Sequence, residues 1–339
     1  MGKMTHYCGL IPLLFPRALT TLILTYSSVV TWTRATVIDS FTRTIIICVL
    51  VSATIYTYFK VISIGAGSPL DFEPLKVKNS EHAEVGLEFP PEFLSKKSVT
   101  LRQNGRYRYC ATCGVWKPDR SHHCSSCNKC YLKRDHHCPW FSSCIGFNNQ
   151  KFFVQFLMYS TLYSISIFIA ATLQIVSWFR NQNYTTQYID INLLVVWLLS
   201  TGASVSLFCF TGFSIYLLTK NQTTNELNAS KYLNRDLEIF NESLGHSPQS
   251  VGNPFDLGSR YQNWCVVMGY TWREWLLPIK TDSQKKNRQS LDEKGLFYQL
   301  NSEVYSRLHE SMFLQDQLMK RLSPRSSADL THPLLSPGD

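Results

Sequence analysis

Charged residues are scarce in this chain. Asp, Glu, Lys and Arg make up only 17% of its 339 residues, whereas hydrophobic residues make up 45%; an average soluble protein has about 25% charged residues. So apolar a composition excludes a chain that is disordered throughout, and the length excludes a small disulfide-stapled secreted scaffold. Acidic residues are scarcer than basic ones, 24 against 33. The resulting net charge of +9 favours a nucleic acid, an anionic membrane face or an anionic small molecule as a partner.

Four apolar stretches contain no charged residue at all. Phe152–Phe179 and Ile191–Thr219 each exceed the roughly 20 residues that cross a bilayer. Ala18–Thr33 and Thr44–Phe59 are shorter, but they are flanked by Arg or Lys, whose long side chains extend a span by reaching the interface. We therefore expect four transmembrane helices. The alternative for the two long stretches, a pair of buried core helices, is weaker because charge-free helices of that length are rare in soluble domains.

Basic residues are unevenly distributed between the segments that connect these stretches. Lys60–Lys151 and Lys220–Asp339 contain fourteen each, whereas the connection between the third and fourth stretches has only Arg180. Because basic residues mark the cytosolic side of a membrane protein, both segments and the N-terminus are expected in the cytosol, beside the anionic leaflet. This placement weakens the nucleic-acid interpretation.

The expected fold class is an all-α polytopic membrane protein with four transmembrane helices. A cytosolic module rich in cysteine separates the second helix from the third. The expected divisions are residues 1–66 for the first two helices, 67–151 for the module, 152–219 for the last two helices, 220–322 for a cytosolic C-terminal region and 323–339 for a disordered tail. The tail is assigned because its residues are mostly Ser, Pro and charged ones.

The module concentrates cysteine and histidine between residues 110 and 144. A cytosolic location keeps thiols reduced and argues against a disulfide framework. Two Cys-x2-Cys pairs, which begin at Cys110 and Cys124, have the spacing of zinc knuckles. Two tetrahedral zinc ions use eight ligands, so three of the eleven candidates remain for chemistry. The candidates are Cys110, Cys113, His122, His123, Cys124, Cys127, Cys130, His136, His137, Cys138 and Cys144.

A carboxylate, two imidazoles and a thiol follow one another at Asp135-His136-His137-Cys138. A cysteine nucleophile needs a nearby base to become a thiolate. A histidine base needs a carboxylate to fix its tautomer and to stabilise its cation. The run therefore predicts nucleophilic catalysis, although spacing alone does not distinguish a base from a metal ligand between His136 and His137.

At this run the chain resembles the DHHC protein S-acyltransferases, or palmitoyltransferases. The resemblance covers roughly residues 10 to 280, and one departure from it is Gly67-Ser68-Pro69, where many members have Asp-Pro-Gly. A narrower likeness to the fungal vacuolar members, in residues 67–72, 116–120 and 255–258, implies the vacuole membrane. The matching motifs are Cys110-x2-Cys113, Lys117-Pro118-x-Arg120, His122-His123-Cys124-x2-Cys127-x2-Cys130, Asp135-His136-His137-Cys138-Pro139-Trp140, Cys144-Ile145-Gly146, Asn148, Phe152-Phe153, Thr223-Thr224-Asn225-Glu226 and Asn263.

The resemblance implies two structural zinc ions and a covalent reaction. Cys138 is then the nucleophile, His136 its base and Asp135 the residue that orients the base. A long acyl chain passes from palmitoyl-CoA to Cys138 and then to cytosolic cysteines of peripheral or membrane-associated proteins. The implied zinc ligands are Cys110, Cys113, His123 and Cys130 for one ion, and Cys124, Cys127, His137 and Cys144 for the other.

Four residues are candidates for binding the substrate. Lys117 and Arg120 carry charges suited to the CoA phosphates, with a solvated surface charge as the alternative. By resemblance, Tyr163 lies near the far end of an acyl slot and limits chain length, with bundle packing as the alternative. Trp140, next to the nucleophile, packs on the chain or belongs to the core of the zinc module.

Residues after the fourth stretch are expected to support the site. By resemblance, Thr223 and Thr224 hydrogen-bond the Asp135 region, and Glu226, in the same motif, supports the structure of the site. The alternative is a helix N-cap, which Glu226 also fits. Asn263 is expected to be a buried amide that ties the C-terminal region to the bundle.

Two other classes of function compete with an enzyme. A membrane-anchored zinc module that only binds a partner would leave Cys138 dispensable. A transporter is disfavoured because residues 152–179 and 191–219 contain no ionisable acid, base or histidine. A nucleic-acid reader is disfavoured because Tyr107-Arg108-Tyr109 is the only aromatic–basic run, and it is short.

Overall fold

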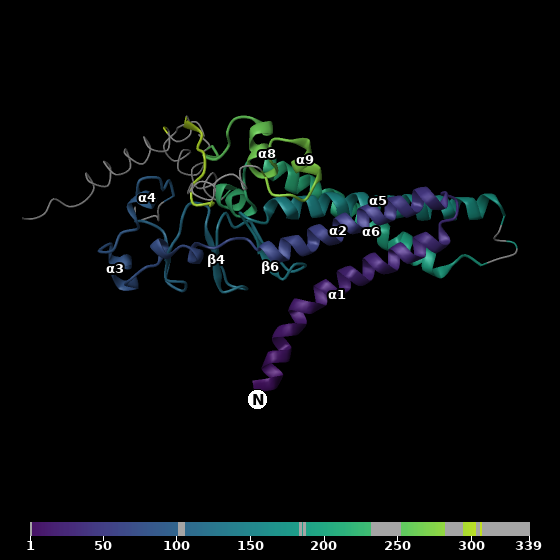
Figure 1. The fold of residues 1–339 in the computed structure, drawn as a ribbon, viewed down its shortest axis with the longest axis horizontal. Coiled ribbons are helices and arrows are strands. Elements are labelled where there is room, and N and C mark those ends of the chain that lie inside the picture. Colours follow the sequence, from purple (N-terminus) through teal and green to yellow (C-terminus); the bar gives the residue numbers. More distant parts are fainter. Residues whose placement is uncertain are drawn as a thin grey trace, which may run out of the picture.

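In the computed structural model of this protein, four long helices form a bundle and a module of short strands lies beyond one end of it (Figure 1). The long helices are α1 (Gly2–Arg34), α2 (Ser40–Ile64), α5 (Gln150–Arg180) and α6 (Ile191–Thr219). The structure describes residues 2–100, 106–182, 185, 188–231, 252–281, 294–302 and 306, and only the backbone of residues 2–13.

Three of these helices, α2, α5 and α6, are long and apolar enough to cross a membrane. Helix α6 has the bounds of the predicted stretch, and α5 and α2 each extend beyond theirs at both ends. In the part of the chain that the structure describes, α1 is not among the helices with spanning character. Its stretch of residues 18–33 contains five Thr and two Ser, which makes it more polar than the stretches within α5 and α6.

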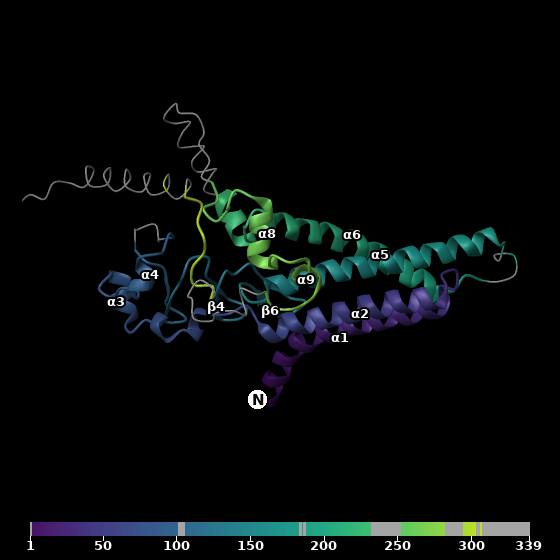
Figure 2. The ribbon, with the colours of Figure 1, turned by 45° about the horizontal axis from the view of Figure 1, so that its top comes forward.

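Several hydroxyl groups of α1 are bonded within the helix itself, although that of Thr31 is buried with no hydrogen-bond partner among the described residues. Thr20, Thr25 and Ser27 each donate to the carbonyl four residues earlier, at 2.7 to 2.8 Å. Its C-terminal part packs against the other three long helices, whereas its N-terminal part runs away from them in both views (Figures 1 and 2).

The end of the bundle farthest from the module is fixed by helix caps. Asp39 accepts a hydrogen bond from the backbone N–H of Thr42 at 2.9 Å and begins α2. Asp190 accepts one from the N–H of Asn192 at 2.8 Å and begins α6. Arg34, at the end of α1, pairs with Asp190 at 3.1 Å and joins the two helix ends.

The module consists of three antiparallel hairpins preceded by short helical segments. The all-α expectation was therefore incomplete, because strands of two or three residues are too short to show a period-2 pattern in the sequence. The helical segments are η1 (Pro69–Asp71), η2 (Glu73–Leu75), α3 (Ser80–Val85) and α4 (Glu92–Ser95). The hairpins are β1 (Tyr109–Cys110) with β2 (Val115–Trp116), β3 (His122–Cys124) with β4 (Lys129–Tyr131), and β5 (His136–Cys138) with β6 (Ser143–Ile145).

Two short helices, α8 (Arg260–Met268) and α9 (Trp272–Leu276), lie over the junction of bundle and module (Figure 2). Asn263 of α8 donates to the carbonyl of Thr219 at 3.0 Å and to the carboxylate of Asp256 at 2.7 Å. Its buried amide thus connects this segment to the end of α6. The expected tail, residues 323–339, lies outside the described residues.

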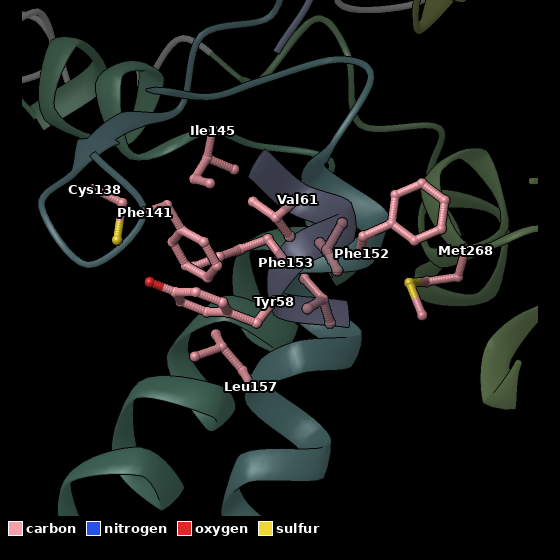
Figure 3. Close-up of a cluster of buried hydrophobic side chains, with 11 residues drawn as sticks. Tyr58, Val61, Cys138, Phe141, Ile145, Phe152, Phe153, Leu157 and Met268 are labelled. Atoms are coloured by element: carbon pink, nitrogen blue, oxygen red, sulfur yellow. The ribbon is translucent and has the colours of Figure 1, made fainter. Parts of the chain in front are cut away.

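A buried apolar cluster joins the module to the bundle (Figure 3). Tyr58 of α2 stacks near Phe141 of the module, with ring centroids 5.0 Å apart, and its hydroxyl donates to the carbonyl of Trp140 at 2.7 Å. Cys138 lies at one end of the cluster beside Phe141, and Met268 of α8 lies at the other. The Asp-His-His-Cys run is therefore held against the ends of the long helices.

Candidate active site and metal centres

Two groups of Cys and His side chains lie close enough to hold a metal ion. In each group the four ligand atoms all lie within 4.8 Å of one another. The groups are Cys110, Cys113, His123 and Cys130, and Cys124, Cys127, His137 and Cys144. These are the two ligand sets that the resemblance implies, and the four residues of each come together from two consecutive hairpins.

Strand pairing explains why each group combines those residues. In β3 and β4, His123 is paired with Cys130, and in β5 and β6, His137 is paired with Cys144. Each such pair meets the Cys-x2-Cys turn of the preceding hairpin, which begins at Cys110 in one group and at Cys124 in the other. The hairpins are thereby linked in series.

The atoms present fit zinc. Sγ of Cys127 and Sγ of Cys144 lie 3.8 Å apart, which is about the separation of two thiolates that sit ~2.3 Å from one tetrahedral ion. In both groups the histidine offers Nδ1, which lies 3.3 Å from Sγ of Cys113 and 3.2 Å from Sγ of Cys127. Three thiols and one imidazole suit a closed structural zinc site, whose ion stabilises the fold.

Alternation along β5 separates the metal ligand from the catalytic candidates. Successive side chains of a strand point to opposite faces, so His136 and Cys138 share one face and His137 takes the other. On that other face, His137 lies with the three cysteines of the second metal group. Nδ1 of His136 lies 3.1 Å from Oδ2 of Asp135, while its Nε2 is buried with no hydrogen-bond partner in the described part of the chain.

Electrostatics favour a charged His136. Burial by itself lowers the pKa of His136, but the hydrogen bond to Asp135 and the negative charges of Asp135 and the nearby Cys138 outweigh it and raise the pKa to about 9. Burial also raises the pKa of Asp135, and here the charge of His136 and the donors of Thr224 outweigh it, so the pKa lies below its ordinary value of 3.8. A charged imidazole held by a carboxylate therefore lies next to the candidate nucleophile.

Thr224 holds the carboxylate of Asp135 from the segment after α6. Its backbone N–H donates to Oδ1 of Asp135 at 2.6 Å, and its hydroxyl lies 2.9 Å from the same atom and 2.7 Å from the carbonyl oxygen of Asp135. One residue earlier, the N–H of Thr223 donates to Oε2 of Glu226 at 2.9 Å, and the N–H of Glu226 donates to the Thr223 hydroxyl at 3.2 Å. This reciprocal cap fixes the segment that presents Thr224.

Arg120 does not have the exposure that phosphate binding requires. Its side chain is 0% exposed, and it binds Glu226 through two nitrogens, at 2.7 and 2.8 Å. It also donates to Oδ1 and the carbonyl oxygen of Asn221, at 3.0 and 2.9 Å, and the ring of Phe255 lies 4.3 Å away. These contacts show that Arg120 anchors the C-terminal segment to the module; they do not support the expectation that Arg120 holds CoA, which stays a prediction.

Removing the Arg120 partner is expected to destabilise the fold. Glu226→Gln leaves a buried guanidinium without a counter-charge, which costs about 3–5 kcal/mol. The pKa of Glu226 lies below its ordinary 4.5, because Arg120 outweighs the effect of burial; the contribution of the pair is thus complete above pH 4.5 and is lost as the pH falls through the folded-state pKa. Thermal unfolding followed by intrinsic fluorescence measures the loss.

The matched control is Glu73→Gln, because Glu73 pairs with Lys76 at 2.6 Å and both side chains are at least half exposed. Exposed pairs contribute little, so this variant should unfold like the wild type. An equal loss of stability in the two variants would contradict the role given to Arg120.

A largely apolar cavity of about 470 Å³ opens beside Cys138 and runs between the long helices. Trp140 and Phe141 line it near the thiol, and Trp140 is 54% exposed. Tyr163 lines it about 15 Å further along α5, by the ten residues that separate it from Phe153. The Tyr163 hydroxyl lies 2.7 Å from that of Ser27, so α1 helps to close this part of the cavity.

Some residues of this site escaped the sequence reasoning. The ring of His136 lies 5.3 Å from that of Phe153 and 6.5 Å from that of Phe210, and both phenylalanines line the cavity. Phe153 was noted only as part of a matching motif, without a role, and Phe210 occurs in an apolar stretch where nothing distinguishes it from the other phenylalanines. Lys117 is half-buried in the module and is not among the residues that line this cavity.

The fold and the site together define a membrane protein that carries a Cys–His–Asp group on a double Cys/His metal module. The model of the family described as "DHHC palmitoyltransferase" matches residues 103–231. Together with the relatives below, this shows that the chain belongs to the DHHC palmitoyltransferase family.

Curated relatives match most of the chain. Palmitoyltransferase PFA3 of Eremothecium gossypii is 48% identical over 320 residues, which cover 94% of this chain and 98% of that protein. Palmitoyltransferase PFA3 of Saccharomyces cerevisiae is 47% identical over 316 residues, covering 93% and 94%. Palmitoyltransferase ZDHHC20 of Bos taurus is 35% identical over 238 residues, covering 66% and 60%.

Proposed function

We propose that this protein is a protein-cysteine S-palmitoyltransferase that works through an acyl-enzyme on Cys138. The single observation that carries the proposal is the position of Cys138, which lines the apolar cavity and stands two residues after His136, on the same face of β5. A thiol at the mouth of an apolar slot, with a histidine–carboxylate pair beside it, suits the transfer of a long acyl chain.

The reaction takes two thioester exchanges. In the resting site the proton of Cys138 is held on Nε2 of His136, which is the charged form of His136 that the site favours, and the Cys138 thiolate forms a bond with the thioester carbonyl carbon of palmitoyl-CoA. The bond to the CoA sulfur breaks, and the proton on His136 goes to the leaving CoA thiolate. The thiol of a protein substrate then attacks the acyl-Cys138 thioester, His136 takes the substrate proton, and the Cys138 thiolate is restored. Asp135 keeps His136 oriented and stabilises its cation.

The test uses the purified full chain with alkyne-labelled palmitoyl-CoA and a membrane-tethered cysteine peptide as acceptor. Label that hydroxylamine removes from the protein, and that passes to the peptide, is the expected result. No label on a protein that holds two zinc ions would overturn the enzyme proposal and favour the membrane-anchored zinc module that only binds a partner.

The acyl chain is proposed to end at Tyr163, so shortening this side chain should extend the slot. Each buried CH2 stabilises binding by ~0.8 kcal/mol, and Tyr163→Ala is therefore expected to raise turnover of an acyl-CoA two carbons longer than palmitoyl-CoA, relative to palmitoyl-CoA itself, by roughly tenfold. Competition between the two acyl-CoAs, read by mass spectrometry, measures the ratio. Leu162→Ala is the control, because Leu162 is 52% exposed and does not line the cavity; a similar shift in that variant would argue against Tyr163 as the limit.

The membrane topology and the location are part of the proposal. Helix α1 completes a set of four spans, which the internally bonded hydroxyls of Thr20, Thr25 and Ser27 support, because a bilayer leaves no water to satisfy such groups. The distribution of Lys and Arg supports a cytosolic module and cytosolic termini, where acyl-CoA and the cysteines of membrane-associated proteins are accessible. Lys117 is proposed to contact the CoA phosphates, and the resemblance to vacuolar members supports the vacuole membrane.

A further inference from the structure

A second cavity lies where the module, the start of α5 and the C-terminal segment meet. Its volume is about 230 Å³, below the ~300–1,000 Å³ of sites that enclose a drug-sized ligand. Lys133 of the segment between β4 and β5, Gln150 and Lys151 of α5, and residues 265–267 of α8 contribute to its walls. Its lining has no residue in common with the cavity beside Cys138, so the acyl chain does not account for it.

Lys133 is the most unusual group in this lining. It is only 3% exposed, and among the described residues no hydrogen bond or ion pair is found for its Nζ. Burial lowers the pKa of Lys133 to about 7, and the positive charge of Arg120 acts in the same direction. The negative charges that act on Lys133, those of Glu226 and Asp135, are already engaged by Arg120 and His136. Burying an ammonium group without a partner has a high free-energy cost. An anion bound in the cavity would lower this cost by pairing with the Lys133 side chain.

The first turn of α5 adds further positive character. Lys151 is 1% exposed, and its Nζ donates to the carbonyl of Ile279 at 2.8 Å, which fixes it in the wall. Gln150 is 6% exposed, and in the part of the chain that the structure describes its side-chain amide has no hydrogen-bond partner. This turn contains no acidic residue and has no side-chain cap, although the N-terminus of a helix attracts negative charge.

The lining contains two lysines and no Asp or Glu. We propose that this cavity binds a phosphate group, which Lys133, Gln150 and the N-terminal end of α5 would hold together. A tetrahedral anion with several acceptor oxygens suits a helix N-terminus beside an ammonium group. The phosphate belongs either to the headgroup of an anionic lipid or to a soluble phosphoester, since Tyr270 and Gln299 of the lining are exposed to solvent.

Binding is measured on the purified full chain in detergent, with inorganic phosphate as the probe and no acyl-CoA present. The wild type is expected to gain thermal stability as phosphate is added, and Lys133→Met to bind phosphate at least tenfold more weakly. Methionine removes the charge but keeps an unbranched side chain, so the variant should fold. Lys76→Met, a lysine half exposed and paired with Glu73, is the matched control and should bind phosphate like the wild type. Gln150→Leu provides a second variant and should also bind more weakly.

Lipid nanodiscs distinguish the two sources of the phosphate. Nanodiscs of phosphatidylcholine with or without phosphatidic acid are compared, and retained lipid is counted by native mass spectrometry. Phosphatidic acid retained by the wild type but not by Lys133→Met identifies a lipid headgroup, and phosphate binding without lipid retention identifies a soluble phosphoester. No binding of either probe to the wild type, or equal binding to Lys133→Met, would overturn the proposal. So would a tenfold rise in the KM for palmitoyl-CoA in Lys133→Met, because the cavity would then belong to the acyl donor.

Discussion

Replacing Cys138 by serine is expected to lower acyl transfer by at least ~10³-fold and to abolish hydroxylamine-labile label on the protein. A serine hydroxyl is far harder to ionise than a thiol, so His136 cannot turn it into a comparable nucleophile. Loss of a nucleophile usually removes nearly all of the chemical step, because the catalytic residues act as a unit. Single-turnover labelling with alkyne-palmitoyl-CoA measures the effect.

Zinc content and a second cysteine variant make this test specific. Cys138 belongs to neither metal group, so Cys138→Ser should still contain two zinc ions. Cys209→Ser is the matched control, since Cys209 is an exposed thiol on α6, and it should be labelled like the wild type. If Cys138→Ser were labelled as strongly as the wild type, the nucleophile would be another residue.

The parts of the structure that local patterns encode were predictable. Charge-free stretches gave α5 and α6 nearly to the residue, because length and hydropathy suffice for a span. The two Cys-x2-Cys pairs indicated two metal sites, because the spacing of two ligands along the chain is also a local pattern. Which of His136 and His137 binds metal was not local information, since it follows from the alternation of β5 and from the pairing of His137 with Cys144.

Contacts between distant segments limited what the sequence could show. Arg120 was expected to bind phosphate because it is basic and lies in the module, whereas its burial depends on Glu226, which is 106 residues away. The support of Asp135 by Thr224, 89 residues away, was expected only through the resemblance. Burial of Lys133 likewise depends on the packing of α5 and the C-terminal segment around it, which no spacing within the module predicts.

Loss of one zinc ligand is the other large effect that the structure predicts. His123→Ala is expected to reduce bound zinc from two ions per chain to one and to make the module sensitive to protease. Structural zinc contributes about 10–16 kcal/mol of apparent binding free energy in small zinc domains, and here each ion would link two hairpins that have little other pairing. Elemental mass spectrometry measures the zinc content, and limited proteolysis measures the protease sensitivity. Neither measurement requires an activity assay.

The two His-His pairs supply matched controls for this prediction. His122 and His136 each stand next to a ligand histidine but belong to neither metal group, so His122→Ala and His136→Ala should both retain two zinc ions. His137→Ala should lose one, as His123→Ala does.

His136→Ala should lose acyl transfer although it keeps both zinc ions, because the His136 ring faces Asp135 instead of a metal group. If His123→Ala kept both ions and His122→Ala lost one, then His122 would be the zinc ligand in place of His123. That result would refute the strand register from which the ligand was assigned. Zinc content and acyl transfer, measured on the same four variants, therefore separate the residues that build the module from the one proposed to move the proton.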